Sequence, residues 1–169
     1  TRGVKVTGGK HWHWGVRWAL GVGLALGPLG AGAATWRGAL NVTGDWHQAS
    51  NWDPAQVPGA GDTVLISSGA VWLTQSTDPL ASFALTNATL IFTNWNSALN
   101  ATDIWVRNQG LLTLPSAFTN NQMSNNIYVV CSNFTLEAGG RVLADVRGYA
   151  RANGPGKGVT AGSNLGAGG

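Results

Sequence analysis

The chain has 169 residues, a length typical of one domain, with 25 glycines, nine tryptophans and only 10% charged residues, against about 25% in an average soluble protein. Four of the ten basic residues precede residue 18, and from residue 34 onward there are six basic and seven acidic residues. The body of the chain therefore lacks the net positive charge that is typical of a nucleic-acid-binding protein. The single cysteine, Cys131, excludes an internal disulfide and any cysteine-clustered metal site within this chain.

Residues 1–34 are predicted to be a secretory leader. A basic stretch is followed by an apolar run over residues 18–29 and then by the small residues Ala31-Gly-Ala33, which are the three parts of a signal peptide. A run of about twelve residues is too short to cross a bilayer, which takes about 20. We therefore expect a signal-peptide helix that is cleaved after Ala33 or Ala34; a buried helix is the alternative interpretation.

Residues 35–63 are predicted to be a Trp/Asn-rich cap. Trp36, Trp46 and Trp52 stand among Gly, Asn, Asp and Pro residues, which interrupt regular structure every few positions. We predict that the three indole rings cover the end of a core and that their N–H groups donate to nearby carbonyls. An exposed platform for stacking sugars is the alternative.

One extended motif runs from the cap into the following segment, with the pattern W-x-G-x-x-N…W-x-x-x-x-N-W-x-P-x-x-V-P-x-x-x-D-x-V-x-I. Its residues are Trp36, Gly38, Asn41, Trp46, Asn51, Trp52, Pro54, Val57, Pro58, Asp62, Val64 and Ile66. This motif resembles the opening of large secreted bacterial β-solenoid proteins, which include autotransporter-adhesin-like proteins and repeat proteins of planctomycete and verrucomicrobial type. The resemblance implies export and a parallel β-helix, and it implies no defined activity.

Residues 64–147 are predicted to be the rungs of a β-solenoid. Turn residues follow one another after 19, 21 and 25 positions, and apolar residues recur at fixed offsets on either side of each turn. Such units bury their inward rows only by stacking about 4.8 Å apart. The four predicted inward rows are Val64, Ile66, Val71 and Leu73; Phe83, Leu85, Leu90 and Phe92; Ile104, Val106, Leu112 and Leu114, the last two being one residue late; and Val129, Cys131, Leu136 and Ala138.

The corners of these rungs are predicted at Ser68, Asn87, Asn108 and Asn133. Asparagine suits a corner because it tolerates the left-handed conformation and its side chain bonds to the nearby backbone. The three asparagines are also placed to stack as an internal amide ladder.

No catalytic signature is found in the sequence. The acidic residues that follow the cap, Asp78, Asp103, Glu137 and Asp145, share no offset in successive units, so they cannot be stacked into the carboxylate pair that acid/base hydrolysis requires. We therefore predict no catalytic residue, no cofactor and no metal site in this chain.

Polar, Asn-rich loops separate the rungs, and a binding surface would be expected there. Trp95 lies in one such loop, and Trp105 alternates outward between two inward-facing residues. We name Trp95 and Trp105 as candidate carbohydrate contacts; packing against a neighbouring coil is the alternative.

Together these patterns predict an all-β chain, namely the start of a right-handed parallel β-helix with a Trp-rich N-terminal cap and a Gly-rich flexible tail over residues 148–169. We expect an exported structural or adhesin-like segment of a larger cell-surface or extracellular protein, whose partners are extracellular polysaccharide or cell-surface components. A chain that starts with Thr1 rather than Met is interpreted as a fragment. The alternatives are the N-terminal part of a polysaccharide-active β-helix enzyme and a carbohydrate-binding module.

Overall fold

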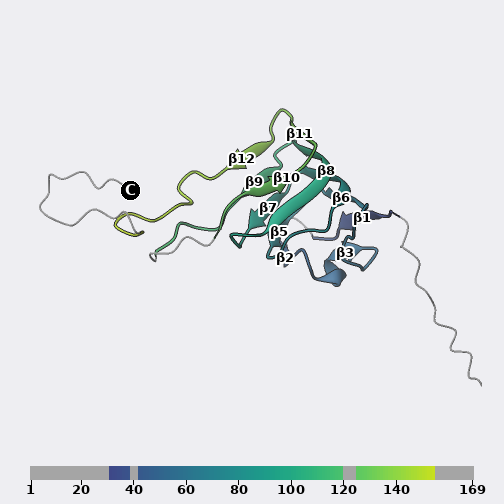
Figure 1. The fold of residues 1–169 in the computed structure, drawn as a ribbon, viewed down its shortest axis with the longest axis horizontal. Coiled ribbons are helices and arrows are strands. Elements are labelled where there is room, and N and C mark those ends of the chain that lie inside the picture. The colour runs from purple at the N-terminus through teal and green to yellow at the C-terminus, as the bar shows by residue number, and fades with distance from the viewer. Residues whose placement is uncertain (1–30, 39–41, 120–124, 155–169) are drawn as a thin grey trace, which may run out of the picture.

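The computed structural model describes residues 31–38, 42–119 and 125–154, and over these residues the chain is all-β (Figure 1). Most of the predicted leader and the tail beyond residue 154 therefore lie outside the described residues. Within the described residues, no helix is long and apolar enough to cross a membrane. The elements are β1 (Ala33–Trp36), β2 (Thr43–Asp45), the short 3-10 helix η1 (Ala49–Asn51), β3 (Trp52–Asp53), β4 (Thr63–Ile66), β5 (Ala70–Leu73), β6 (Leu80–Thr86), β7 (Thr89–Phe92), β8 (Ala98–Arg107), β9 (Leu111–Thr113), β10 (Tyr128–Val130), β11 (Asn133–Leu136) and β12 (Arg141–Leu143).

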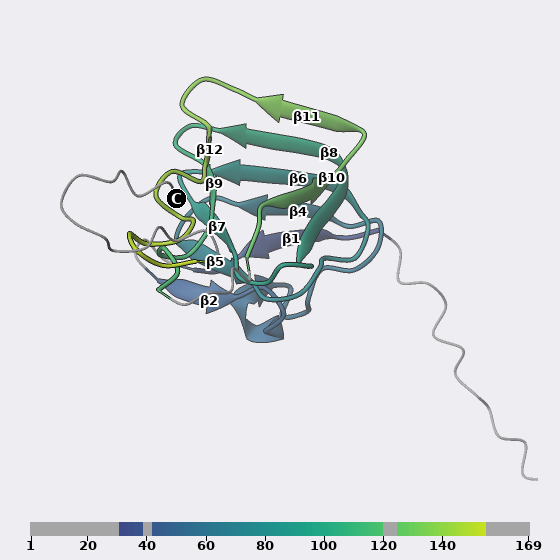
Figure 2. The ribbon, with the colours of Figure 1, turned by 60° about the vertical axis from the view of Figure 1, so that its left-hand side comes forward.

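The strands form two sheets between which the chain alternates. One sheet has the order β10-β8-β6-β4-β1-β3, with β11 also paired to β8, and the other has the order β12-β9-β7-β5-β2. Among the described strands the pairing is parallel, apart from the antiparallel pair β1–β3. Figure 2 shows β1, β4, β6, β8 and β11 side by side with their arrows pointing the same way. We call each pair of successive strands, one from each sheet, a layer: β4/β5, β6/β7, β8/β9 and β11/β12.

The inward rows of the first three layers lie where the alternation predicts. Val64 pairs with Phe83, which in turn pairs with Ile104. In the other sheet Val71, Leu90 and Leu112 follow one another, so the one-residue delay in the third layer is confirmed. The inward residues of these layers are at most 4% exposed. Because each such residue contributes about 1.5–3 kcal/mol when buried, these columns hold the two sheets together.

The predicted fourth row is wrong by five residues in the larger sheet and by six in the other, where Leu112 pairs with Val142 rather than Leu136. The partners of Ile104 and Val106 are Phe134 and Leu136, not Val129 and Cys131. Val129 instead lies in β10, which pairs with the first part of β8, and it is partly buried there against the core. Strand β8 is ten residues long and offers two successive pairing segments, so two short strands of the following chain line up along it.

The position of Cys131 and Asn133 follows from this shift. Cys131 is an exposed free thiol rather than a core residue, and Asn133 is the first residue of β11, where its side-chain amide donates to Asp103 Oδ1 at 2.7 Å. The corner of the fourth layer is at Ala138-Gly139, where Ala138 O accepts from the backbone N–H of Asn108. The predicted internal amide ladder is not found: Asn133 lies away from the corner, and Asn87 and Asn108 are exposed and are joined to each other through their backbones.

Those two corners adopt the conformation that the sequence predicts. Asn87 and Asn108 have φ values of 48° and 45°, in the left-handed region that asparagine tolerates better than most residues. The backbone N–H of Asn87 donates to Asn108 O at 2.8 Å, so the corners of successive layers are bonded directly to each other.

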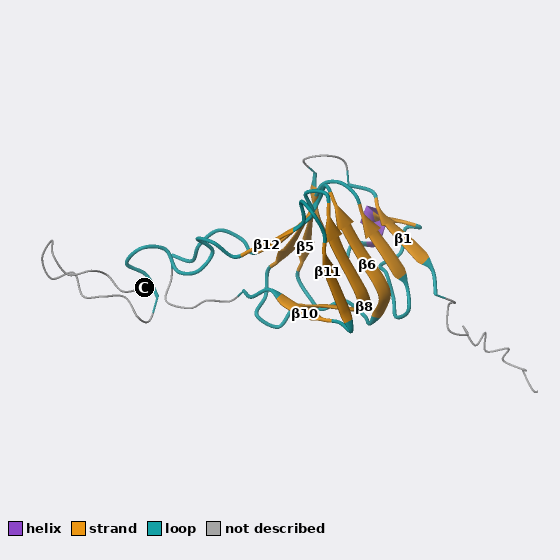
Figure 3. Cartoon of the chain, turned by 90° about the horizontal axis from the view of Figure 1, so that it is seen from above, coloured by secondary structure: helices purple, strands orange, loops and turns teal. Residues whose placement is uncertain are grey.

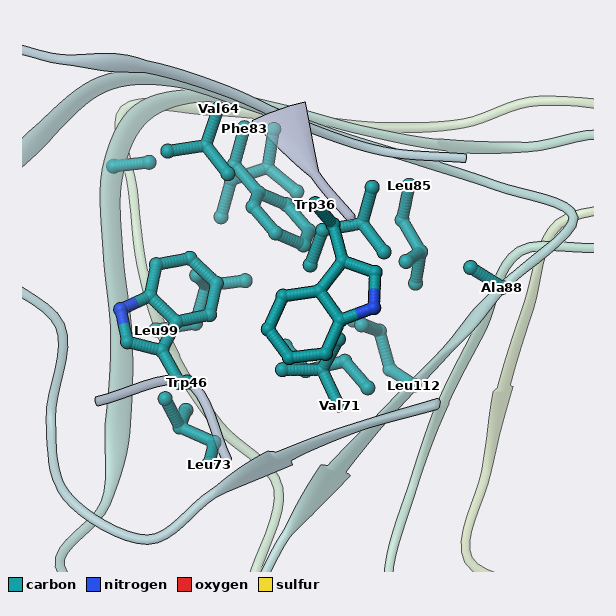
Figure 4. Packing of buried hydrophobic residues seen from close by; sticks show 14 of the residues in the cluster. Trp36, Trp46, Val64, Val71, Leu73, Phe83, Leu85, Ala88, Leu99 and Leu112 are labelled. Atoms are coloured by element: carbon teal, nitrogen blue, oxygen red, sulfur yellow. The ribbon is translucent and has the colours of Figure 1, made fainter. Parts of the chain in front are cut away.

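The three tryptophans of the cap close one end of the core, as predicted. Trp46 and Trp52 are fully buried and Trp36 is 4% exposed, and their rings meet edge to face with centroids 4.8–5.1 Å apart. Figure 4 shows Trp36 and Trp46 pointing into the space between the sheets with Val64, Val71 and Phe83. Trp52 Nε1 donates to Trp46 O at 2.6 Å, as predicted, but the buried Nε1 atoms of Trp36 and Trp46 have no hydrogen-bond partner among the described residues, contrary to the prediction. A sugar-stacking platform made of these three rings is thus wrong, because their faces are covered.

The cap is continuous with the layers rather than a separate unit. Strand β1 pairs in parallel with β4, and β2 pairs in parallel with β5, so the cap adds one strand to each sheet. Ala33 and Ala34, the predicted cleavage residues, are the first two residues of β1. The stacked strands of the larger sheet are seen from above in Figure 3.

Candidate functional site: the Trp95 groove and the open last layer

Trp95 lies in the loop between β7 and β8 and is 52% exposed. It borders an open hollow of about 450 Å³, which is within the usual volume range of ligand sites. The hollow is formed by two loops from successive layers and is lined by Thr74, Gln75, Ser76, Asn94, Trp95, Asn96 and Ser97. We call this hollow the Trp95 groove.

Hydrogen bonds between the two loops fix the shape of the Trp95 groove. Ser76 Oγ donates to Asn96 O at 3.1 Å and accepts from the backbone N–H of Ala98 at 3.0 Å. The side-chain amide of Asn94 donates to Thr74 O. These bonds join positions 20–22 residues apart in the sequence, which become neighbours only because the layers stack.

The rim of the Trp95 groove keeps unused polar groups. Gln75 and Asn96 are exposed, and within the described part of the chain neither side-chain amide has a hydrogen-bond partner. Ser97 Oγ is buried and has no partner among the described residues. None of the lining residues is charged, so the groove combines one aromatic face with neutral donors and acceptors.

Behind the groove, the cap supports one of its walls. Thr74 Oγ1 donates to Asp45 Oδ2 at 2.8 Å, and Asp45 Oδ1 accepts from the backbone N–H of His47 at 2.7 Å. His47 Nε2 lies 3.2 Å from Ser76 O. His47 thus contacts the backbone carbonyl of Ser76, while the Ser76 hydroxyl donates to Asn96 O. Ser76 and His47 are therefore not arranged as a nucleophile hydrogen-bonded to its general base.

The structure does not bring Trp105 into the same site. Trp105 lies in β8 with its backbone paired to Ala84 on one side and Thr135 on the other, and it is partly buried on the outward face of the sheet. It does not border the Trp95 groove. Sequence reasoning found Trp95 but missed Gln75 and Ser76, because only the register of the layers places them beside it.

The last layer forms a second distinctive surface. Phe134, Leu136 and Val142 are 41%, 50% and 46% exposed, although their partners Ile104, Val106 and Leu112 in the third layer are fully buried. Three inward-facing side chains of the last layer are therefore about half exposed to solvent, whereas the aligned residues of the earlier layers are buried.

The acidic residues do not gather into a metal-binding group within the described ranges. There, no group of three or more His, Cys, Asp or Glu side chains converges in a way that could hold a metal ion. Asp103 is bonded to Asn133, and Glu137 Oε1 lies 3.9 Å from Arg107 Nη1. Neither Asp103 nor Glu137 lines the Trp95 groove.

Comparison with known families matches residues 51–142 to the G8 domain, which covers more than half of the chain and extends from the cap to β12. The G8 domain is an extracellular, β-rich domain. No curated protein and no solved structure matches the chain. The comparisons do not test the resemblance to autotransporter-adhesin-like proteins, which stays a prediction.

Proposed function

We propose, from the premise that this chain belongs to the G8 domain family, that it is the opening of a right-handed parallel β-helix in an exported protein. Its role is structural or adhesive: it starts and supports a solenoid at the cell surface or outside the cell, and it carries out no catalysis itself. The predicted leader over residues 1–34 directs its export.

The register between layers is the observation that carries this proposal. Residues at equivalent places in β4, β6, β8 and β11 pair directly, and so do those in β5, β7, β9 and β12. A chain that visits the same two sheets in turn, always in parallel, has the connectivity of a solenoid. The pairing of β10 with the first part of β8 supports a third side to the coils that contain these two strands.

The open last layer supports the idea that further coils follow this one. Edge strands with exposed apolar side chains associate with other strands unless they are covered. A following coil would bury Phe134, Leu136 and Val142 as their partners are buried. Because these side chains are already about half buried, each would gain about half of the roughly 1.5–3 kcal/mol of a full burial. A structural role in a longer stack would explain why the inward-facing side chains of the last layer are half-exposed.

Duplication of one coil tests the proposal directly. Residues 87–107 run from one corner to the residue before the next, and Arg107 is the register partner of Thr86. A copy of residues 87–107 inserted between Arg107 and Asn108 therefore reproduces a native junction and, in a solenoid, adds one layer. We expect a higher β-sheet signal in circular dichroism and a higher melting temperature than in a control with the same 21 residues in scrambled order.

The scrambled control separates stacking from tolerance of an inserted loop. Long surface insertions cost little in free energy, so mere survival of the fold is not informative. If the native-order and scrambled insertions give the same β-sheet signal and the same melting temperature, the layers do not behave as repeating coils and the proposal fails.

A carbohydrate-binding role is the second candidate function. The specific observation that favours it is the Trp95 groove, whose lining combines an exposed indole with unpaired amides. This role is compatible with a structural one, since an adhesive surface protein needs a binding surface.

A further inference from the structure

The packing of the protein does not explain why Trp95 is exposed. The cap tryptophans are buried in the core, whereas Trp95 leaves about half of its surface in water beside a polar hollow. A single exposed aromatic residue is ordinary on protein surfaces. What distinguishes Trp95 is that its loop is rigidly held and its neighbours carry unused hydrogen-bonding groups.

The rigidity of the groove favours binding. Three hydrogen bonds link the Thr74–Ser76 loop to the Asn94–Ala98 loop, and Thr93 Oγ1 donates to Leu73 O at the base of the same loop. A site whose loop backbone is already ordered loses less conformational entropy on binding. Both loops also extend directly from strands of the core rather than from its edges.

The chemistry of the lining selects the ligand class. The face of an indole ring is electron-rich and accepts the C–H groups on the apolar face of a pyranose. The amides of Gln75 and Asn96 each offer two donors and an acceptor, which suit the hydroxyl groups around the same ring. No lysine, arginine or acidic side chain lines the groove, so it offers no counter-charge to uronate or sulfate groups.

We propose that the Trp95 groove is a binding subsite for a neutral polysaccharide, in which Trp95 stacks on one pyranose ring while Gln75 and Asn96 hydrogen-bond to its hydroxyl groups. The groove is open rather than enclosed, which leaves room for the neighbouring units of a polysaccharide chain. Trp105 has no part in this subsite. The proposal is independent of whether further coils follow the last layer.

Affinity electrophoresis in native gels tests this site with the full chain. The gels contain galactomannan, xyloglucan or mixed-linkage β-glucan as neutral polysaccharides, with polygalacturonate as the acidic comparison. We expect retardation by at least one neutral polysaccharide, and a loss of affinity of at least about tenfold in Trp95→Ala, which corresponds to about 1.4 kcal/mol. Trp95→Phe should retain part of the affinity, and Gln75→Ala combined with Asn96→Ala should weaken it.

Trp72→Ala is the matched control, because Trp72 is also exposed, at 39%, but lies in β5 and does not border the groove. It should bind like the unmodified chain, and the melting temperatures of all variants show whether they are folded. The proposal is overturned if none of the three neutral polysaccharides retards the protein, if only polygalacturonate does, or if folded Trp95→Ala binds as tightly as the unmodified chain.

Discussion

Replacing Gly110 by alanine should destabilise the stack through a direct clash between layers. Gly110 closes the turn between β8 and β9, and its N–H donates to Arg107 O. A Cβ atom added there would lie 2.5 Å from Leu85 O and 2.9 Å from Arg107 O, both of which are backbone atoms that cannot rotate away. The turn therefore needs glycine because the neighbouring layer approaches so closely.

The size of the effect follows from the cost of overpacking. Forcing one extra carbon into a well-packed site costs about 1–3 kcal/mol, and for a chain of this length each kcal/mol lowers the melting temperature by about 2–4 °C. We expect Gly110→Ala to lower the free energy of unfolding by about 1–3 kcal/mol, and the melting temperature by about 2–12 °C. Urea denaturation followed by circular dichroism measures the first value and a thermal scan the second.

Gly148→Ala is the control for the loss of a glycine as such, because no atom lies within 4 Å of the added Cβ atom at that position. Its free energy of unfolding should stay within about 0.5 kcal/mol of that of the unmodified chain. Gly140 occupies the equivalent turn one layer further on, where the added Cβ would lie 2.2 Å from Val106 O, so Gly140→Ala should resemble Gly110→Ala. Equal stabilities for Gly110→Ala and Gly148→Ala would refute the close approach of the layers.

Three further predictions concern the columns, the corners and the leader. Leu85→Ala should cost about 2–5 kcal/mol because Leu85 is fully buried, whereas Leu136→Ala at the aligned, half-exposed position should cost less than about 1 kcal/mol; similar losses in urea denaturation would contradict the difference in burial. Asn108→Val should cost roughly 1–2 kcal/mol because the φ of 45° is unfavourable for a branched residue, while Asn108→Gly should leave the melting temperature nearly unchanged. Fusion of residues 1–34 to an alkaline phosphatase without its own leader should export active enzyme, and deletion of residues 18–29 should abolish this; activity that stays inside the cell would exclude the leader.

The sequence predicts the first three layers because strict alternation around a polar corner leaves one choice of inward face. It also predicts the buried Trp cap, because three large aromatic side chains that lie among turn-forming residues are expected to cover the end of the core. It fails at the fourth layer, where Val129 with Cys131 and Phe134 with Leu136 each place two apolar residues two positions apart, so that either pair fits as the next strand. The choice depends on the length of β8, which pairs with both, and no local pattern reveals that length.

The Trp95 groove was only partly predictable for a related reason. The exposed indole stands out in the sequence, but its partners in the groove come from a loop about 20 residues earlier, at a distance set by the spacing of the layers. Trp105 looked equivalent because it alternates outward, yet it lies on a sheet face beside other strands. A binding site that spans two layers can be assembled from sequence only after the register is known.

The unequal lengths of the layers indicate where this fold accepts change. The corners at Ser68, Asn87 and Asn108 are followed by the next corner after 19, 21 and 30 residues, yet the inward columns stay aligned across all of them. Additional residues are therefore absorbed by the loops and by extra pairing such as that of β10, because a shift within a strand would expose its whole inward row. The columns fix the shape of the stack while the loops between them are free to vary, and this division places any ligand specificity of the chain in segments such as the one that carries Trp95.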